Sequence, residues 1–328
     1  LLVVDNLTSK VHIITHVNPN EESFEKGLRK LSLIEANIKK SFEYSSTPSE
    51  NIKSEDFVSS FGRENYISAV EKVQKYIKAG DVMQVVPSQR LSCAFKSNPV
   101  ELYRQLRILN PSPYMYFLNL NGFAIVGSSP EILTRVDNNS IATIRPIAGT
   151  RSRGKTLEED LKLEEDLLSD EKEIAEHLML IDLGRNDLGR IAKTGSVTLT
   201  DKMFIERYSH VMHIVSNVEC ELKENMSSID VLRATFPAGT LSGAPKVRAM
   251  EIIDEVEDLK RNIYSGAIGN LSWHGGMDLA IAIRTAIVKD QRLYIQAGAG
   301  IVYDSLPEME WQETMDKAQA LIKAAQNI

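Results

Sequence analysis

The spacing of apolar residues divides most of this chain into strands and amphipathic helices. Two apolar runs flank a polar turn at 6–10, which predicts a hairpin over 1–17. Helices are expected at 21–40, 64–80 (ending at Gly80), 157–183, 228–235, 243–257 and 308–326, with a polar loop over 43–56. Strands are expected at 82–95, 115–120, 122–127, 131–136, 141–148, 263–272, 277–288 and 292–297, with hairpin turns at Asn121-Gly122 and Asn138-Asn139. Strands and helices come in blocks rather than in strict alternation, so the pattern favours an α+β fold with largely antiparallel sheets.

Two of the expected helices carry glutamates three residues apart. In "SDEKEIAEHLMLIDLGRND", Ile174, Leu178 and Ile181 form an apolar side, which places Glu173 and Glu176 roughly opposite the core. A solvated acidic face is the ordinary explanation of such a pair.

The last helix repeats the arrangement, because Glu310 and Glu313 lie roughly opposite an apolar seam made by Trp311, Met315, Ala318 and Ile322. Lys317 follows one turn after Glu313 and could pair with it. Two such pairs raise the prospect that both converge on a hard cation, since Mg²⁺ takes carboxylate, water and substrate oxygens. The residues alone leave both explanations open.

Several segments could receive an anion. "LAIAIRTAIV" (279–288) is expected to be one strand with Arg284 among alanines on one face, where its planar fork could bind a carboxylate or simply reach water. "IQAGAGIV" places Gly298 and Gly300 after a strand, where backbone N–H groups can approach an anion closely. "AGTLSGAPK" (238–246) is a small-residue loop entering a helix, and "RPIAGTRSRGK" (145–155) is either a basic anion loop or a counterweight to the acidic block 157–176.

Composition narrows the function further. The chain has 328 residues and a net charge of −7, which argues against non-specific nucleic-acid binding, and no apolar run is long enough to cross a membrane. Cys93 and Cys220 lack metal or redox spacing and suit reduced structural thiols in a cytoplasmic protein. His210 and His213 lack further zinc ligands at sensible spacing, so proton transfer by one of them, or a structural role, is favoured over metal binding.

Long motifs resemble one known family. "RPIAGTRSRG", "DEKEIAEHLMLIDLGRNDLGR", "YSHVMHIVS", "PAGTLSGAPK", "YSGAIG", "AIAIRTAIV", "QAGAGIVYDS" and "PEMEWQETMDKA" are together similar to the chorismate-utilising enzymes, from about residue 60 to the end. The resemblance implies an α/β/β/α sandwich with two mostly antiparallel sheets and Mg²⁺-dependent chemistry on chorismate. It divides the chain into 1–58, a remnant of an N-terminal region and linker, and 59–328, the chorismate-binding catalytic domain.

The resemblance also assigns roles to single residues. Glu176 and Glu313 match magnesium ligands, with Glu173 and Glu310 behind them, while Glu131 matches a general acid and His213 the histidine implicated in pyruvate loss. The chorismate-binding positions are matched by Gly149, Thr150, Tyr264, Arg284, Gly298, Ala299, Gly300 and, beside them, Lys317.

Two positions indicate which reaction the family resemblance implies. Gln84 stands where water-adding members carry a lysine base, and a glutamine cannot deprotonate water, whereas ammonia needs no such base. Ala148, in "PIAGT", stands where another branch carries a nucleophilic lysine, so no covalent intermediate is expected. Direct amination followed by pyruvate elimination would give anthranilate. The alternatives are an enzyme that stops at aminodeoxyisochorismate, or a truncated, non-catalytic chorismate-binding module.

The resemblance implies a partner and a regulatory pocket as well. No cysteine lies in a nucleophile elbow, so ammonia would come from a separate glutamine amidotransferase subunit (component II). Pro113, Tyr114 and Met115 match part of a tryptophan feedback pocket, whose Leu-Leu-Glu-Ser motif is missing here. Since the chain also begins without Met inside an apparent strand, we expect a fragment with weak or absent tryptophan inhibition.

Overall fold

The computed structural model describes residues 1–40, 51–208 and 211–328. Contacts divide the chain into two compact units, residues 1–48 and residues 49–328. In the smaller unit, β1 (Leu2–Asp5) and β2 (Lys10–Ile13) form the predicted antiparallel hairpin, and α1 (Phe24–Ile38) confirms the predicted helix. Residues 43–50 of the predicted loop 43–56 lie outside the described residues, and so does His210. The division at residue 58 stays a prediction.

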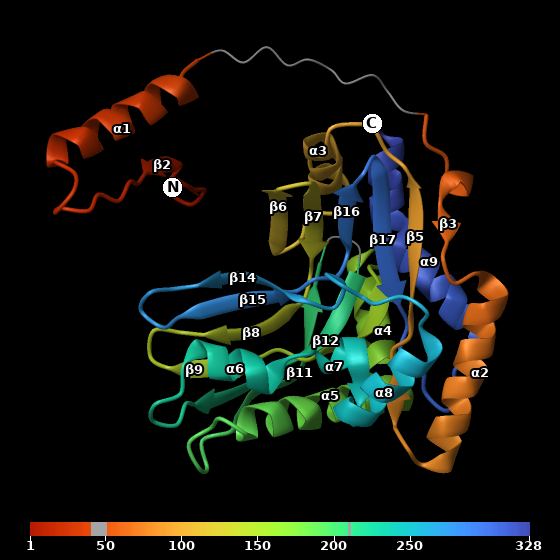
Figure 1. Ribbon diagram of the computed structural model, residues 1–328. Coiled ribbons are helices and arrows are strands. Elements are labelled where there is room, and N and C mark those ends of the chain that lie inside the picture. Colours follow the sequence, from red (N-terminus) through yellow and green to blue (C-terminus); the bar gives the residue numbers. More distant parts are fainter. Residues whose placement is uncertain (41–50, 209–210) are drawn as a thin grey trace. The chain divides into compact units, whose positions relative to one another are not determined.

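Two antiparallel sheets form the body of the larger unit (Figure 1). One sheet has seven strands, in the order β10-β12-β9-β8-β15-β14 with β11 beside β12. The other has six, in the order β3-β5-β17-β16-β7-β6, and a small ladder joins β13 to β4. Every pairing in these sheets is antiparallel.

The helical segments of this unit are η1 (Ser54–Asp56), α2 (Arg63–Ala79), α3 (Pro99–Leu109), α4 (Leu157–Ser169), α5 (Glu171–Gly189), α6 (Ser228–Thr235), α7 (Gly239–Ser242), α8 (Lys246–Val256) and α9 (Pro307–Gln326). Its strands are β3 (Val58–Ser59), β4 (Gln84–Val85), β5 (Ser88–Ala94), β6 (Tyr114–Leu120), β7 (Phe123–Ser129), β8 (Ile132–Val136), β9 (Ile141–Ile144), β10 (Ile147–Ser152), β11 (Thr198–Arg207), β12 (Val211–Glu221), β13 (Gly243–Ala244), β14 (Ala267–Leu271), β15 (Met277–Ile281), β16 (Thr285–Lys289) and β17 (Arg292–Gly298).

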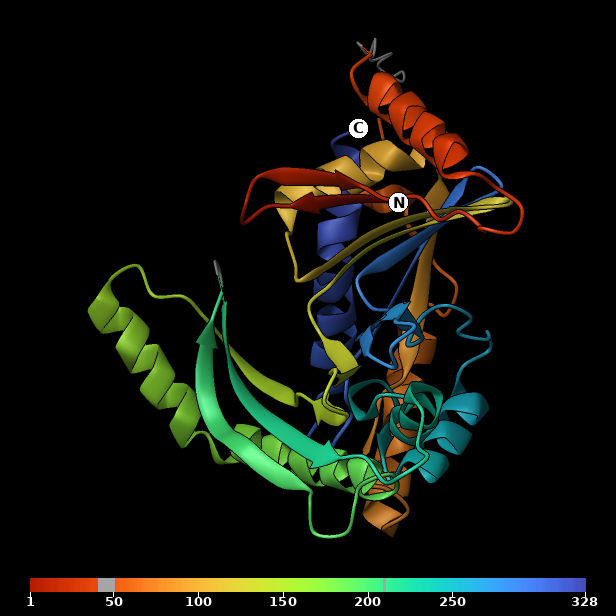
Figure 2. The same ribbon diagram turned by 90° about the vertical axis from the view of Figure 1, so that its left-hand side faces the viewer.

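Helices cover each sheet from outside. One apolar core joins α3 and α9 to the six-stranded sheet, and another joins α5 and α6 to the seven-stranded sheet. Figure 2 shows α4 and α5 lying along the long curved strands β11 and β12. The predicted α+β class and α/β/β/α sandwich are therefore confirmed.

Four elements expected to be continuous are broken, and the first of them is the strand expected over 82–95, which divides into β4 and β5. The helix expected over 157–183 is two helices, because Asp170 leaves the helical conformation (ψ 103°) and its side chain caps α5 by accepting from the N–H groups of Lys172 and Glu173. The strand expected over 141–148 divides into β9 and β10. The strand expected over 277–288 divides into β15 and β16, which belong to different sheets.

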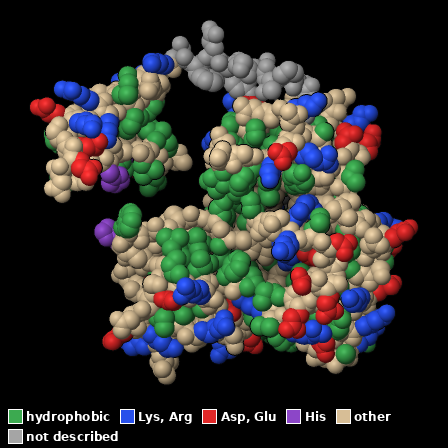
Figure 3. Space-filling view, viewed as in Figure 1, with side chains coloured by type: hydrophobic (Ala, Val, Ile, Leu, Met, Phe, Trp, Pro, Cys, Tyr) green, Lys and Arg blue, Asp and Glu red, His purple; other side chains and the backbone are tan. Residues whose placement is uncertain are grey.

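Surface apolar side chains gather over β6 and over β14 and β15 (Figure 3), and Leu118, Leu120 and Leu271 are among the exposed ones. Among the described residues, no helix has the length and apolarity that crossing a membrane requires. Cys93 and Cys220 are both buried. The cytoplasmic location stays a prediction.

Candidate functional site

The chain passes from one sheet to the other twice, and the two crossings lie side by side. After β7 it passes through Ser129 and Glu131 into β8, and after β15 it passes through Arg284 into β16. The crossings are tied by backbone hydrogen bonds, from Ile281 N–H to the Glu131 carbonyl (3.0 Å) and from Ser128 N–H to the Arg284 carbonyl (3.1 Å). This pairing brings a carboxyl and a guanidinium to one place between the sheets.

Glu131 is poised to carry a proton near neutral pH. Burial raises the pKa of its carboxyl to about 7, although the hydrogen bond from Thr240 and the charges of Lys317 and Arg284 pull the pKa down. Thr240 Oγ1 donates to Glu131 Oε1 at 2.7 Å. Thr240, one of two hydroxyl residues in the small-residue loop 238–246, is a residue of this site that the sequence reasoning missed.

Arg284 occupies the break between β15 and β16, not the middle of a strand. Its φ of +47° lies in the left-handed region, so the predicted alternation of faces over 279–288 holds only within each half. Burial lowers the pKa of the guanidinium, and Glu131 opposes that shift. Among the residues that the structure describes, no hydrogen bond or ion pair of this guanidinium is present, so its planar fork can receive an anion.

The acidic pair on α5 faces inward, which corrects the sequence prediction. Of the residues expected in the core, Ile181 is buried and Ile174 partly buried, but Leu178 is 43% exposed. His177, Leu180 and Gly184 are buried as well. These three follow Glu173 at four, seven and eleven residues, so the carboxylates share the buried side of the helix. Burial first, and then the charge of Glu176, raise the pKa of Glu173.

On α9 the predicted apolar seam is confirmed, since Ala318 and Ile322 are buried and Trp311 and Met315 partly so. Glu310, however, is itself buried, while Glu313 is half exposed. Burial, reinforced by the charge of Glu313, raises the pKa of Glu310.

A continuous chain of contacts joins the two acidic helices. On the α5 side, Gln84 Nε2 donates to Glu176 Oε1 at 3.1 Å, and Gln84 also packs so closely on Gly300 that a Cβ there would lie 2.8 Å from Nε2. On the α9 side, Lys317 Nζ pairs with Glu313 Oε1 at 2.6 Å and donates to the Gly298 carbonyl at 3.0 Å. The segment 298–300, at the end of β17, therefore lies between the two carboxylates.

The carboxylates fit a divalent ion as two pairs rather than as one cluster. Within residues 1–40, 51–208 and 211–328, no three or more His, Cys, Asp or Glu side chains gather closely enough to hold a metal. Magnesium needs only one or two protein carboxylates when water and substrate oxygens complete its shell. Burial, and after it the charge of the neighbouring glutamate, raises the pKa values of Glu173 and Glu310, and a bound cation would favour the ionised form of both.

His213 lies on β12, beside Gly149 and Thr150 of the neighbouring strand β10. Gly149, with φ +66°, sits at a register shift that turns its carbonyl to His213 Nδ1 at 3.0 Å, and Thr150 Oγ1 lies 3.1 Å from the same nitrogen. A carbonyl can only accept, so Nδ1 carries the hydrogen and Nε2 keeps its lone pair. Burial lowers the pKa of His213, and the charge of Arg284 adds to this shift. A neutral imidazole near Arg284 can act as a base.

The remaining predicted residues border the same segment. Tyr264 is buried, and burial raises its pKa well above the usual range, so its hydroxyl remains a donor. That hydroxyl would lie 2.9 Å from a Cβ at position 298, and Ala299 is buried with its N–H bonded to Pro87.

Other residues of the two loops that could bind anions make contacts within the protein. Arg151 pairs with Asp166 and Asp170, and Arg153 pairs with Asp160, so the basic segment does balance the acidic helices. In the loop 238–246, Gly243 packs against the Gln84 backbone, where a Cβ would lie 2.1 Å from the carbonyl oxygen.

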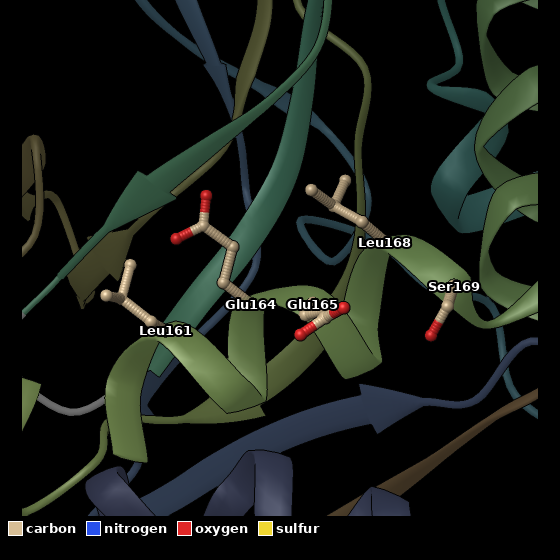
Figure 4. A pocket seen from close by; sticks show the side chains of 5 residues that line it. All are labelled: Leu161, Glu164, Glu165, Leu168 and Ser169. Atoms are coloured by element: carbon tan, nitrogen blue, oxygen red, sulfur yellow. The ribbon is translucent and has the colours of Figure 1, made fainter. Parts of the chain in front are cut away.

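The predicted tryptophan-pocket residues lie at the start of β6. Pro113 comes just before this strand, and Tyr114 and Met115 are its first two residues. Tyr114 Oη donates to Asp278 Oδ1 at 2.7 Å, which links β6 to β15 and thus the two sheets. A separate cavity of about 390 Å³ is lined only by Leu161, Glu164, Glu165, Leu168 and Ser169 of α4 (Figure 4). It contains none of the predicted catalytic residues.

Comparison with known proteins identifies the family of this chain. The family model described as chorismate binding enzyme matches residues 1–323. Anthranilate synthase component 1 of Pseudomonas putida is 56% identical over 99% of this chain, and that of Aquifex aeolicus is 55% identical over 99%. The chain spans about 66% of the length of these curated relatives.

Solved structures give the same picture. Anthranilate synthase component I from Streptococcus pneumoniae superposes with a TM-score of 0.90 at 44% identity, covering 98% of this chain and 71% of that one. The menaquinone-specific isochorismate synthase of Escherichia coli (TM-score 0.77, 23% identity, 91% and 69% covered) shares the fold. The chain belongs to the chorismate binding enzyme family.

Proposed function

We propose that this chain converts chorismate and ammonia to anthranilate and pyruvate with the help of Mg²⁺, as component I of an anthranilate synthase. The observation that carries the proposal is the contact chain from Glu176 through Gln84 and the segment 298–300 to Lys317 and Glu313. These contacts link two carboxylates, a lysine and the backbone of Gly298 and Gly300, which supports one site next to the pairing of Glu131 and Arg284. Relatives at 56% identity carry the name anthranilate synthase component 1, which supports the proposal.

Chorismate carries two carboxylates, and the site offers separate groups for them. The guanidinium of Arg284 suits one carboxylate in a bidentate bond, and the backbone at Gly298 and Gly300 would receive the other. Gly149, Thr150, Tyr264 and Lys317 border the same space. Glu176 and Glu313 would hold Mg²⁺, with Glu173 and Glu310 behind them. When bound, the ion supplies a Lewis acid for a carboxylate of the substrate and lowers the repulsion among these glutamates.

Amination needs a proton for the leaving hydroxyl but no base for the nucleophile. The nitrogen of ammonia forms a bond to a ring carbon while the ring double bonds shift and the hydroxyl leaves as water, and the new ammonium group then gives up one proton to become the amine. Glu131, whose pKa is about 7, gives that hydroxyl its proton. Gln84 holds Glu176 and offers no base that could activate water, which favours ammonia as nucleophile.

Pyruvate is then eliminated. Nε2 of His213 takes the proton from the ring carbon that bears the new amine, and the electron pair completes the aromatic ring. The bond between the ring and the ether oxygen breaks, and the enolpyruvate that leaves takes up a proton to become pyruvate. The neutral state of His213 suits this role, because a protonated imidazole could not accept the proton.

Ammonia would be delivered by a glutamine amidotransferase subunit, component II. Pro113, Tyr114 and Met115 would form part of a tryptophan site, with weak or absent inhibition in this chain.

The test is product analysis with the chain alone. Chorismate, ammonium and Mg²⁺ should give fluorescent anthranilate and pyruvate in equal amounts, and glutamine in place of ammonium should give none. Chelation of Mg²⁺ should stop the reaction. Efficient use of glutamine would overturn the division of labour, and no consumption of chorismate would overturn the enzymatic proposal in favour of a binding module.

A further inference from the structure

The imidazole of His213 is held on a second side, by side chains of the neighbouring strand β11 and the residue just after it. The ring of Tyr208 meets the His213 ring edge to face, with the centroids 5.7 Å apart and the planes at 64°. Glu206 is the direct cross-strand partner of His213. Since alternate residues of a strand share a face, Glu206 and Tyr208 lie on the His213 side of the sheet.

A series of side-chain contacts holds the Tyr208 ring in place. Tyr208 Oη donates to Glu206 Oε2 at 2.8 Å, and Arg145 Nη2 donates to Glu206 Oε1 at 3.0 Å. The Arg145 guanidinium in turn lies over the Phe204 ring, 5.8 Å from its centroid. Both oxygens of Glu206 are thus engaged. Burial, and then the Glu206 hydrogen bond, raise the pKa of Tyr208 to about 12, so its hydroxyl keeps its proton.

A hydrogen bond at one nitrogen does not by itself fix an aromatic ring. The Gly149 carbonyl holds Nδ1 of His213, but the imidazole can still swing about that contact. The Tyr208 ring supplies the second constraint, so that Nε2 points in one direction. General-base catalysis depends on this direction, because the proton must lie within about 3 Å of the base.

We propose that Tyr208, held by Glu206 and Arg145, is a positioning residue for His213 and thereby decides whether the aminated intermediate becomes anthranilate or is released. This inference rests on the proposed function. It concerns the elimination step alone: the ring C–H proton passes to His213 Nε2, its electron pair enters the ring, and the ether C–O bond breaks as enolpyruvate leaves. When the imidazole is misdirected, amination continues while elimination slows, and the intermediate dissociates.

The experiment compares Tyr208→Ala and Tyr208→Phe with a matched control. Tyr76 provides it, because Tyr76 Oη also donates to a glutamate, Glu255 at 2.5 Å, beneath the guanidinium of Arg248 at 5.1 Å, but on α2 and α8. Chorismate consumption and anthranilate formation are measured in the same reactions with ammonium and Mg²⁺, and the intermediate is identified by mass.

For Tyr208→Ala we expect chorismate consumption close to that of the unaltered chain, with anthranilate formation about tenfold slower and the intermediate accumulating. Tyr208→Phe keeps the ring but not the Glu206 bond and should release a smaller fraction of intermediate. Tyr76→Ala should leave the product ratio unchanged.

A product ratio in Tyr208→Ala equal to that of the unaltered chain overturns the proposal, whether or not the overall rate falls. Should Tyr208→Ala fail to fold, Tyr208→Phe decides in the same way. Failure of the unaltered chain to consume chorismate would instead refute the proposed function, so the two failures are distinguishable.

Discussion

Ionisation of the buried Glu131 carboxyl should lower the free energy of unfolding of this protein. The same burial provides an acid that can give up its proton near neutral pH. Its pKa is about 7 in the folded chain, compared with 4.5 for an unperturbed glutamate. Burial is the main cause, because ionisation inside the protein loses the solvation that water would give. Glu131→Gln keeps the size of the side chain and an oxygen that can accept from Thr240, but removes the ionisable group.

The magnitude follows from linkage. Below pH 4.5 the carboxyl is protonated in both the folded and the unfolded chain, and its ionisation has no effect on stability. Between 4.5 and 7 the folded chain binds more protons than the unfolded chain, so the free energy of unfolding falls as pH rises. At about 1.4 kcal/mol per pKa unit, the ionised group costs about 3 kcal/mol at pH 8.5 and about 1 kcal/mol at pH 5.

Glu131→Gln should therefore stabilise the protein more at pH 8.5 than at pH 5, by about 2 kcal/mol. Urea denaturation of both chains at both pH values, without metal or substrate, measures this difference. Anthranilate formation should fall about 10²- to 10⁴-fold, as expected for loss of a general acid. An equal stability change at pH 5 and pH 8.5 would refute the raised pKa, and unaltered turnover would refute the role in catalysis.

Three further substitutions test the rest of the site. Glu313→Gln breaks a half-exposed ion pair with Lys317 that contributes at most about 1 kcal/mol to stability. Calorimetry should therefore find the melting temperature nearly unchanged, while activity at limiting Mg²⁺ is lost. Equal losses of stability and activity would contradict a metal role. Arg284→Lys keeps the charge but not the planar fork, and steady-state kinetics should show KM for chorismate rising about tenfold or more; an unchanged KM excludes a bidentate carboxylate contact. Gly298→Ala places a Cβ 2.7 Å from the Pro87 carbonyl oxygen, so chemical denaturation should show a free energy of unfolding about 1–3 kcal/mol lower. Gly189→Ala is the control, because open space surrounds that position, and it should not destabilise the chain.

Much of the fold follows from local patterns. Helix α2 ends at Gly80 because the left-handed φ of +85° there suits a residue without a side chain, and this ending is visible in the sequence. The hairpins β6–β7 and β8–β9 turn where polar, glycine-containing or asparagine pairs interrupt the apolar runs. Such features are decided by neighbours in the chain, so the sequence alone predicts them.

The orientation of α5 could not be obtained in this way. Its buried side includes His177, whose imidazole bonds to Ser216 at 2.7 Å and whose burial lowers the pKa to about 4, and Gly184, which lies close to the sheet. A histidine and a glycine do not mark an apolar face, so the pattern of Ile174, Leu178 and Ile181 gave only part of the buried side: Ile181 is buried, whereas Leu178 is exposed. Only the shape of the seven-stranded sheet shows that the carboxylates of this helix turn inward.

The break at 282–284 is the clearest case of tertiary structure overriding a local pattern. Alternation continues across Ala282 and Arg284 without interruption, and nothing nearby breaks a strand, yet the two halves pair with different sheets. Because β15 pairs with β8 and β16 pairs with β7, the chain must pass from one sheet to the other between β15 and β16. The strands β7 and β8 are themselves joined through Glu131, which lies at the other crossing. Two antiparallel crossings side by side place an acid and a guanidinium together from positions 153 residues apart. A charged side chain that interrupts an apolar strand pattern is therefore better interpreted as a candidate crossing between sheets than as a residue at a sheet edge, because the alternation of faces does not continue across a crossing.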